Sequence, residues 1–276
     1  MINPGIINEL SIKRKAVTGI YLADAADNEV LLPNRYVNEN HSIGDKLEVF
    51  VYFDSEDRLV ATTETPKIFL NEFAFLEVKE ITKIGAFLDW GLSKDLLVPF
   101  SEQLKKMTAG EKYVVYLYLD QKTNRLVGTT RLTNYLQQVF ISLSEGDEVD
   151  LLIFEETDLG FKAIVNEDHE GLIYKNEVFQ PLKVGEKVKG YVKMIRDDKK
   201  IDLILQRNDV NDIGFVAANI IQKLNENGGF LAVSDKSDPK AIQELFHVSK
   251  KMFKKAIGNL YRKRQISIDE NGIRIT

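Results

Sequence analysis

Apolar and polar residues alternate in short runs along most of the chain, and this alternation predicts β-strands rather than long helices. In the middle of the chain, turn-forming glycine, asparagine and aspartate residues separate the runs. The five strands expected there are Phe75–Ile81, Gly85–Asp89, Leu96–Pro99, Lys112–Leu119 and Leu126–Thr130, with a short polar helix at Ser101–Lys106. Five short strands in this arrangement predict a small closed barrel of the OB type, because closure removes exposed strand edges.

The same pattern occurs three times. Gly19-Ile20-Tyr21-Leu22 recurs 66 positions later as Gly85-Ala86-Phe87-Leu88, and Leu31-Leu32-Pro33 recurs as Leu97-Val98-Pro99. A third copy follows 75 positions further on, where Gly85 corresponds to Gly160. We therefore expect three tandem barrels: residues 1–65, which diverge most, residues 66–143 including a linker, and residues 144–210.

A different module is expected at residues 211–276, because the hydrophobic period there becomes helical. Ile213–Glu226 is the first predicted helix, and Asp238-Pro239 begins a short second one. Ser249 caps a third helix that continues to about Lys263, and two alternating segments, Gln265–Ile268 and Gly272–Ile275, predict a hairpin. This order is that of a winged helix, so the fold class is mainly β with a C-terminal α+β module.

Composition narrows the class of protein. The chain has 276 residues, a net charge of −5 and no cysteine, which excludes disulfides and zinc held by thiolates. No apolar run is long enough for a membrane helix, and the N-terminus lacks a secretory pattern, so we expect a cytoplasmic protein that has no membrane contact. From Asp212 onward there are 11 Lys and Arg against 7 Asp and Glu, which concentrates basic charge at one end.

Specific residues in the second unit resemble S1 RNA-binding domains. Lys83-Ile84-Gly85-Ala86-Phe87-Leu88-Asp89 resembles their glycine–aromatic second strand. Leu96-Leu97-Val98-Pro99-Phe100-Ser101 resembles their third strand and the turn after it, and Gly110-Glu111-Lys112 resembles the approach to their fourth strand. The resemblance is closest in the second unit, weaker in the third and weakest in the first.

Three S1-like units followed by a winged helix resemble the conserved virulence factor B family of bacterial proteins. The run Ser249-Lys250-Lys251, Phe253-Lys254-Lys255-Ala256-Ile257-Gly258 and Leu260-Tyr261 is especially similar to that family's winged helix. The resemblance implies RNA binding that affects gene expression after transcription.

Aromatic residues in the barrels are the candidates for stacking on bases. In S1 domains an aromatic residue after the strand's glycine commonly lies on the nucleic-acid face, which points to Phe87, although alternation along the strand also allows Phe87 to lie in the core. Around it, Trp90 and Phe100 extend the face, and Lys83 and Arg131 are expected to meet phosphates. The third unit offers Phe161, Lys162, Tyr174 and Lys175. The first unit offers only Tyr21 and carries Glu64 at the position of Arg131, so it is expected to bind poorly.

The third helix of the winged helix is strongly basic. Phe253, Ile257, Leu260 and Tyr261 recur at helical spacing and are expected to face the core. The lysines then project outward as a cationic ridge suited to phosphates, although a solvated surface helix would show a similar pattern. The basic residues of this segment are Lys250, Lys251, Lys254, Lys255, Arg262, Lys263 and Arg264.

No residue pattern supports catalysis, a cofactor or a metal site. His41, His169 and His247 are scattered without metal-ligand spacing, and no glycine-rich phosphate loop is present. The acidic pairs Glu155-Glu156 and Asp197-Asp198 fall at expected turns, where a solvated loop is favoured and a two-carboxylate metal site remains the alternative. We therefore expect a binding protein rather than an enzyme.

The favoured interpretation is a post-transcriptional regulator that binds single-stranded RNA with modest sequence preference. A winged-helix regulator that binds duplex DNA remains an alternative. So does a scaffold whose acidic barrels contact a protein such as a ribonuclease or the ribosome. A hydrolase is the weakest alternative, because no catalytic constellation supports it.

Overall fold

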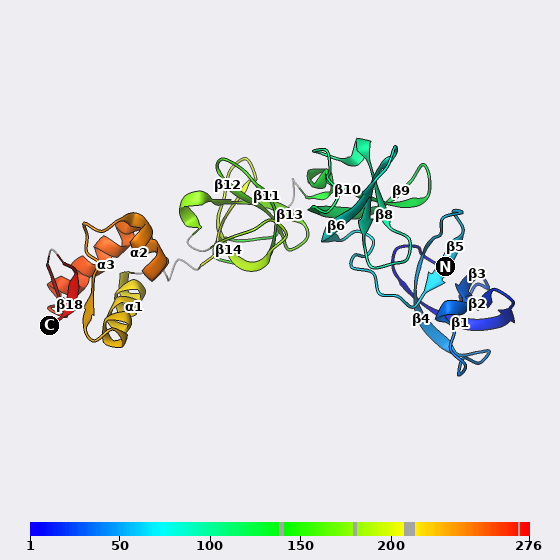
Figure 1. Cartoon of the computed structure of the whole chain (residues 1–276), viewed down its shortest axis with the longest axis horizontal. Coiled ribbons are helices and arrows are strands. Elements are labelled where there is room, and N and C mark those ends of the chain that lie inside the picture. Colours follow the sequence, from blue (N-terminus) through cyan, green and yellow to red (C-terminus); the bar gives the residue numbers. More distant parts are fainter. Residues whose placement is uncertain (138–140, 179–180, 207–212, 270) are drawn as a thin grey trace. The chain divides into compact units, whose positions relative to one another are not determined.

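The computed structural model describes residues 1–137, 141–178, 181–206, 213–269 and 271–276, and it divides into two compact units, Met1–Leu136 and Gln137–Thr276 (Figure 1). Within these residues the chain forms three five-stranded β modules and a helical C-terminal module. This confirms the fold class predicted from the sequence. No helix among the residues described is long and apolar enough to cross a membrane.

The first and third β modules are closed barrels with the same strand order. The first is built from β1 (Ile7–Ala16), β2 (Gly19–Ala23), β3 (Glu29–Pro33), β4 (Lys46–Phe53) and β5 (Leu59–Thr62), in the order β1-β2-β3-β5-β4. The third repeats this order with β11 (Glu148–Glu156), β12 (Gly160–Val165), β13 (His169–Tyr174), β14 (Lys187–Ile195) and β15 (Ile201–Ile204). In both barrels a parallel pairing of the third and fifth strands completes the closure.

The second module differs at this closing position. Its strands are β6 (Phe73–Ile81), β7 (Gly85–Asp89), β8 (Leu96–Pro99), β9 (Lys112–Asp120) and β10 (Arg125–Thr129), each within a few residues of its predicted bounds. Their backbone pairing gives the order β10-β9-β6-β7-β8, without a ladder between β8 and β10, although these two strands lie side by side as in the closed barrels. Side chains fill the closing edge: a Cβ on Gly128 of β10 would lie 2.8 Å from Cγ2 of Val98 on β8. The predicted helix at Ser101–Lys106 is a single 3-10 turn at Phe100–Glu102.

One glycine explains much of the sequence repeat. Gly19, Gly85 and Gly160 each begin the second strand of a module, with φ of 156°, 156° and 159°. In each module, a Cβ at this position would lie within 2.3 Å of a carbonyl oxygen on the neighbouring third strand. Only glycine allows the two strands to approach this closely at that point.

One hydrophobic cluster joins the first two modules, in addition to a separate core inside the first barrel. Phe50 and Tyr52 of β4 belong to the same buried cluster as Leu88 and Val98 of the second barrel. Ile68, in the segment that joins the two barrels, is also fully buried in this cluster. Continuous apolar packing explains why residues 1–136 form one compact unit.

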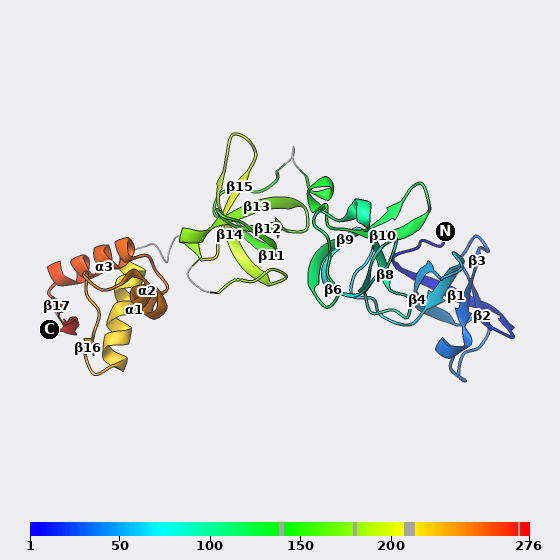
Figure 2. The ribbon, with the colours of Figure 1, turned by 45° about the horizontal axis from the view of Figure 1, so that its top comes forward.

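The C-terminal module is a winged helix. Its elements are α1 (Ile213–Glu226), β16 (Phe230–Leu231), α2 (Pro239–Phe246), α3 (Lys250–Arg262), β17 (Ile266–Ile268) and β18 (Ile273–Ile275), and the sheet order is β16-β18-β17. Helices α1 and α3 pack against each other around Ile220, Phe253 and Ile257 (Figure 2). The predicted caps are confirmed, because Asp238 and Ser249 accept hydrogen bonds from backbone N–H groups in the first turns of α2 and α3. The short strand β16 was not predicted.

Candidate nucleic-acid interface

Phe87 lies on the outer face of the second barrel. Its neighbours on β7, Ala86 and Leu88, are fully buried in the core, whereas Phe87 is only half-buried. It lies opposite Leu97 of β8, which also faces outward. The alternative that Phe87 belongs to the core is therefore wrong, and its ring is placed where a base could stack on it.

Further apolar and basic residues surround the end of β7 and β8. Phe100 and Ile84 are 43% and 59% exposed, and the N–H of Phe100 donates to the carbonyl of Ile84 at 3.4 Å. Lys83 is also exposed. The Arg131 guanidinium donates to the carbonyl of Ser101 at 2.8 Å, which fixes it beside the turn that contains Phe100. Lys83, Phe100 and Arg131 thus adjoin the same two strands as Phe87.

Trp90 does not belong to this outer face. It is 3% exposed, and its ring packs between Phe50 and Tyr52 of the first barrel at centroid distances of 5.8 and 6.2 Å. Its indole N–H donates to the carbonyl of Lys94. The prediction that Trp90 extends the stacking surface is therefore wrong, because the shared core of the two barrels covers the ring.

The corresponding position in the first barrel is already covered. Tyr21 holds the place of Phe87, and the guanidinium of Arg14 lies 3.6 Å from the centroid of its ring. Arg14 is held there by an ion pair with Glu29 at 2.6 Å. A base could stack on Tyr21 only after displacing this arginine, which agrees with the expectation of weak binding by the first unit.

The third barrel places charge where the second has Phe87. Lys162 occupies that position and pairs with Glu155 at 3.7 Å and Glu170 at 3.2 Å, so carboxylates compensate its charge. Phe161 is 9% exposed and belongs to the barrel core, which corrects its prediction as a binding residue. The position of Phe161 corresponds to the buried Ala86 of the second barrel.

Two other candidates in the third barrel remain at its surface. Tyr174 is half-buried, and its hydroxyl accepts a hydrogen bond from Arg196. Lys175, directly after it, is exposed. Tyr174 pairs with Gly160 across the strands. Tyr174 and Lys175 therefore lie at the end of the third barrel that corresponds to the end of the second barrel where Phe100 lies.

Helix α3 presents a continuous basic face to solvent. Phe253, Ala256, Ile257 and Leu260 are buried, and the cationic side chains therefore point away from the core. Lys254 contacts Asp235 at 3.5 Å, and the ammonium of Lys250 donates to the carbonyl of Ser237 at 2.8 Å. The exposed cations of this segment are Lys251, Lys254, Lys255, Arg262, Lys263 and Arg264. Such a face suits contacts with phosphates.

Tyr261 and Gly258 also belong to this face. Tyr261 is 57% exposed, so the expectation that it faces the core is wrong. A Cβ at Gly258, one turn earlier, would meet nothing within 4 Å. An exposed aromatic ring next to bare helix backbone allows a nucleic-acid strand to approach α3 closely.

Arg274 is a basic residue that the sequence analysis missed. It lies on β18, its side chain is exposed, and its guanidinium lies 4.7 Å from the centroid of the Phe230 ring. The alternation of Ile273, Arg274 and Ile275 in the predicted hairpin was the signal that could have identified it.

Among the residues that the structure describes, histidines and acidic residues form no recognisable metal centre. Across the ranges that the structure describes, no three His, Asp or Glu side chains are grouped closely enough to hold a metal ion. His169 is buried, and its Nδ1 lies 3.3 Å from the carbonyl oxygen of Gln137, which is a structural contact.

Comparison with known families identifies the modules. The S1 domain model matches residues 4–64 and 72–131, and the CvfB-like winged helix domain model matches residues 218–275. The S1 match includes the first barrel, in which the sequence resemblance was weakest. S1 domains combined with a winged helix support the binding of nucleic acid.

Relatives match nearly the whole chain. The protein is similar to the uncharacterized protein YitL of Bacillus subtilis, at 28% identity over 98% of this chain and 92% of the relative. It is similar to conserved virulence factor B of Staphylococcus saprophyticus, at 29% identity over 90% of this chain and 86% of the relative. A multidomain protein with nucleic acid binding domains from Streptococcus pneumoniae has a crystal structure that aligns with a TM-score of 0.43 at 22% identity, covering 99% of this chain and 98% of that one. Two kinds of matching domain and relatives along its length show that the chain is similar to the conserved virulence factor B family.

Proposed function

We propose that this protein binds single-stranded RNA and regulates gene expression after transcription. The observation that carries the proposal is the outward position of Phe87. At the corresponding position the first barrel has Tyr21, whose ring Arg14 covers, and the third barrel has Lys162, whose charge is compensated by a carboxylate. Among these three positions, Phe87 is best placed to stack on a base. Stacking requires an unpaired base, and this requirement favours a single strand over a duplex.

Binding is distributed over two kinds of contact. Phe87 and the exposed Phe100 supply stacking in the second barrel, and the cationic face of α3 holds phosphates. Each contact is weak by itself, but modules linked in one chain bind together through their high effective concentration. Stacking tolerates every base, so we expect the sequence preference to be modest.

The protein acts in this proposal as a binding protein in the cytoplasm, without a catalytic step. The basic charge of the winged helix supports contact with the RNA backbone, and the acidic charge of the barrels is compatible with contacts to RNA-processing proteins. Duplex DNA remains the competing ligand, because a winged helix can also place its third helix in a major groove.

The test is fluorescence anisotropy of the full chain with labelled single-stranded RNA, single-stranded DNA of the same length, and duplex DNA, at two salt concentrations. The variant Lys251→Ala/Lys254→Ala/Lys255→Ala removes exposed cations from α3. If the three lysines contact phosphates of a single strand, the slope of log affinity against log salt falls by roughly 2.

The matched control is Lys15→Ala/Lys122→Ala/Lys187→Ala, which removes the same formal charge from exposed positions in the three barrels. The control is expected to keep the wild-type salt slope. Preference for RNA supports the proposal. Tight duplex binding favours the DNA regulator, and the absence of any nucleic-acid binding contradicts the proposal and favours a protein-binding scaffold.

A further inference from the structure

A pocket lies beside the edge of the second barrel at which β8 and β10 form no backbone ladder. In the first barrel, Leu31 of β3 pairs with Val60 of β5, and in the third barrel Leu172 pairs with Asp202. The corresponding residues of the second barrel are Leu97 of β8 and Val127 of β10. In the second barrel no backbone ladder joins these two strands, and both residues line the pocket.

The turn between β4 and β5 of the first barrel covers this edge. Asp57 in the turn forms an ion pair with Arg125 at the start of β10. The ammonium of Lys94, just before β8, donates to the carbonyls of Phe53 and Asp54 at 3.0 and 2.6 Å. Since both contacts join the two barrels inside one compact unit, the turn is held in place as a wall of the pocket.

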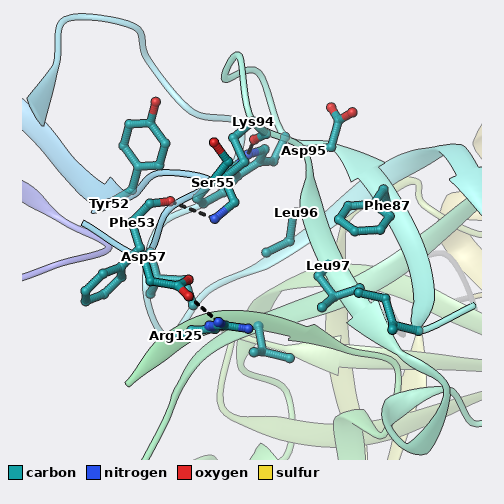
Figure 3. A pocket seen from close by; sticks show the side chains of 14 residues that line it. Tyr52, Phe53, Ser55, Asp57, Phe87, Lys94, Asp95, Leu96, Leu97 and Arg125 are labelled. Carbon is teal, nitrogen blue, oxygen red and sulfur yellow. Dashed lines mark hydrogen bonds and ion pairs between the residues drawn. The ribbon is translucent and has the colours of Figure 1, made fainter. Parts of the chain in front are cut away.

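The pocket, which we call the junction pocket, has a volume of about 290 Å³. Figure 3 shows Phe87 and Leu97 on one side and the Asp57–Arg125 pair on the other. Ligand pockets in proteins typically begin at about 300 Å³, so this one suits a group the size of a single heterocycle. Its defining residues are Tyr52, Phe87, Lys94, Leu97, Arg125 and Val127.

The charges around the pocket disfavour an anion. Asp57 and Asp95 line the pocket, and each carboxylate already has a cationic partner, Arg125 for Asp57 and Lys79 for Asp95. Burial lowers the pKa of Lys94, and its ammonium already donates to two carbonyls. A phosphate would meet these carboxylates without a free cation to compensate them. A neutral flat group with both donors and acceptors on its edge fits better.

We propose that the junction pocket holds one unstacked nucleobase of a bound single strand, with Phe87 against its face and the carboxylates and cations near its polar edge. The inference rests on the proposed RNA binding and makes it more specific. It also gives the first barrel a role: its own Tyr21 position is covered, but its β4–β5 turn completes a base site on the second barrel.

Trp90 provides a direct readout, because it is the only tryptophan of the chain and lines the junction pocket. The full chain is titrated with oligouridylate and oligoadenylate of about twelve nucleotides, a length within the range that one to three such barrels cover. We expect the emission of Trp90 to change along the same titration curve as the anisotropy of labelled RNA.

The variant Ser55→Phe places a ring in the pocket from its solvent side, since Ser55 is exposed and lines the pocket. The matched control is Gln121→Phe, at the corresponding exposed turn between β9 and β10. Ser55→Phe is expected to abolish the Trp90 response and to weaken RNA binding roughly tenfold, as for the loss of one stacked base. Gln121→Phe is expected to leave both unchanged.

A second measurement does not depend on fluorescence. RNA that carries 4-thiouridine is crosslinked to the wild-type chain by light, and the modified peptides are identified. We expect a crosslink in the segment Tyr52–Asp57 of the first barrel, which Ser55→Phe removes.

The outcomes separate the two proposals. If wild-type anisotropy shows RNA binding while Ser55→Phe binds equally well and no crosslink forms in Tyr52–Asp57, the junction pocket is not a base site and RNA binding stands. If the wild-type chain binds no RNA, both proposals are wrong.

Discussion

Phe50 and Trp90 belong to different barrels, yet their rings pack edge to face with centroids 5.8 Å apart. Phe50 is fully buried and Trp90 is 3% exposed, and each ring owes part of its burial to the other barrel. One buried cluster therefore joins the first two S1 domains, and the first domain also has a core of its own. Their relative orientation, on which the junction pocket depends, follows from this packing.

Replacing Trp90 with alanine is expected to destabilise both barrels together. Deleting a buried tryptophan removes packing and leaves a cavity, which typically costs about 3–5 kcal/mol. The free energy of unfolding is measured by urea denaturation of the full chain, followed by circular dichroism. The control Phe100→Ala, at an exposed ring, is expected to change this free energy by less than about 1 kcal/mol. Equal stabilities of the two variants would contradict a shared core around Trp90.

Sequence reasoning predicted the strands well because the information for them is local. Strand alternation and turn residues lie within a few positions of each other, and the repeat supplied the same evidence three times. The steric role of Gly85 also lies within one strand pair, which is why glycine recurs at Gly19 and Gly160. The helices and their caps were predicted for the same reason, since Asp238 and Ser249 act on neighbouring N–H groups.

The errors have separate causes. Trp90 continues the alternation of the buried Ala86 and Leu88, a local signal that the prediction missed, and it packs against Phe50 and Tyr52 of the first barrel. The missing β8–β10 ladder depends on how side chains of both strands fit together, which alternation does not encode. Tyr261 was misplaced for a different reason: it follows the buried Leu260 on the helix and lies just outside the apolar stripe.

Alanine at Gly85 and alanine at Gly258 are expected to have opposite effects on stability. A Cβ at Gly85 would lie 2.3 Å from the carbonyl oxygen of Val98, so Gly85→Ala must separate β7 from β8 at a cost of roughly 2 kcal/mol or more. A Cβ at Gly258 meets nothing within 4 Å, and alanine there favours the helix by about 1 kcal/mol.

Thermal unfolding of the full chain by calorimetry measures both effects. The transition that contains the second barrel is expected to move down for Gly85→Ala, and the transition of the winged helix is expected to move up for Gly258→Ala. An unchanged transition for Gly85→Ala would show that the close approach of these strands is not required.

Phe87→Ala and Tyr21→Ala form a matched pair for RNA binding, because the two residues hold the same position in successive barrels. Phe87 faces outward and lines the junction pocket, whereas Arg14 covers the ring of Tyr21 at 3.6 Å. Loss of one base–aromatic stack costs about 1–3 kcal/mol, so Phe87→Ala is expected to weaken binding of single-stranded RNA by roughly 5- to 150-fold. Tyr21→Ala is expected to change the affinity less than about twofold. Anisotropy titrations at one salt concentration measure both. A similar loss for the two variants would show that Arg14 moves aside and that the first barrel binds RNA through its own face, and no loss for Phe87→Ala would remove the outer face of the second barrel from the RNA site.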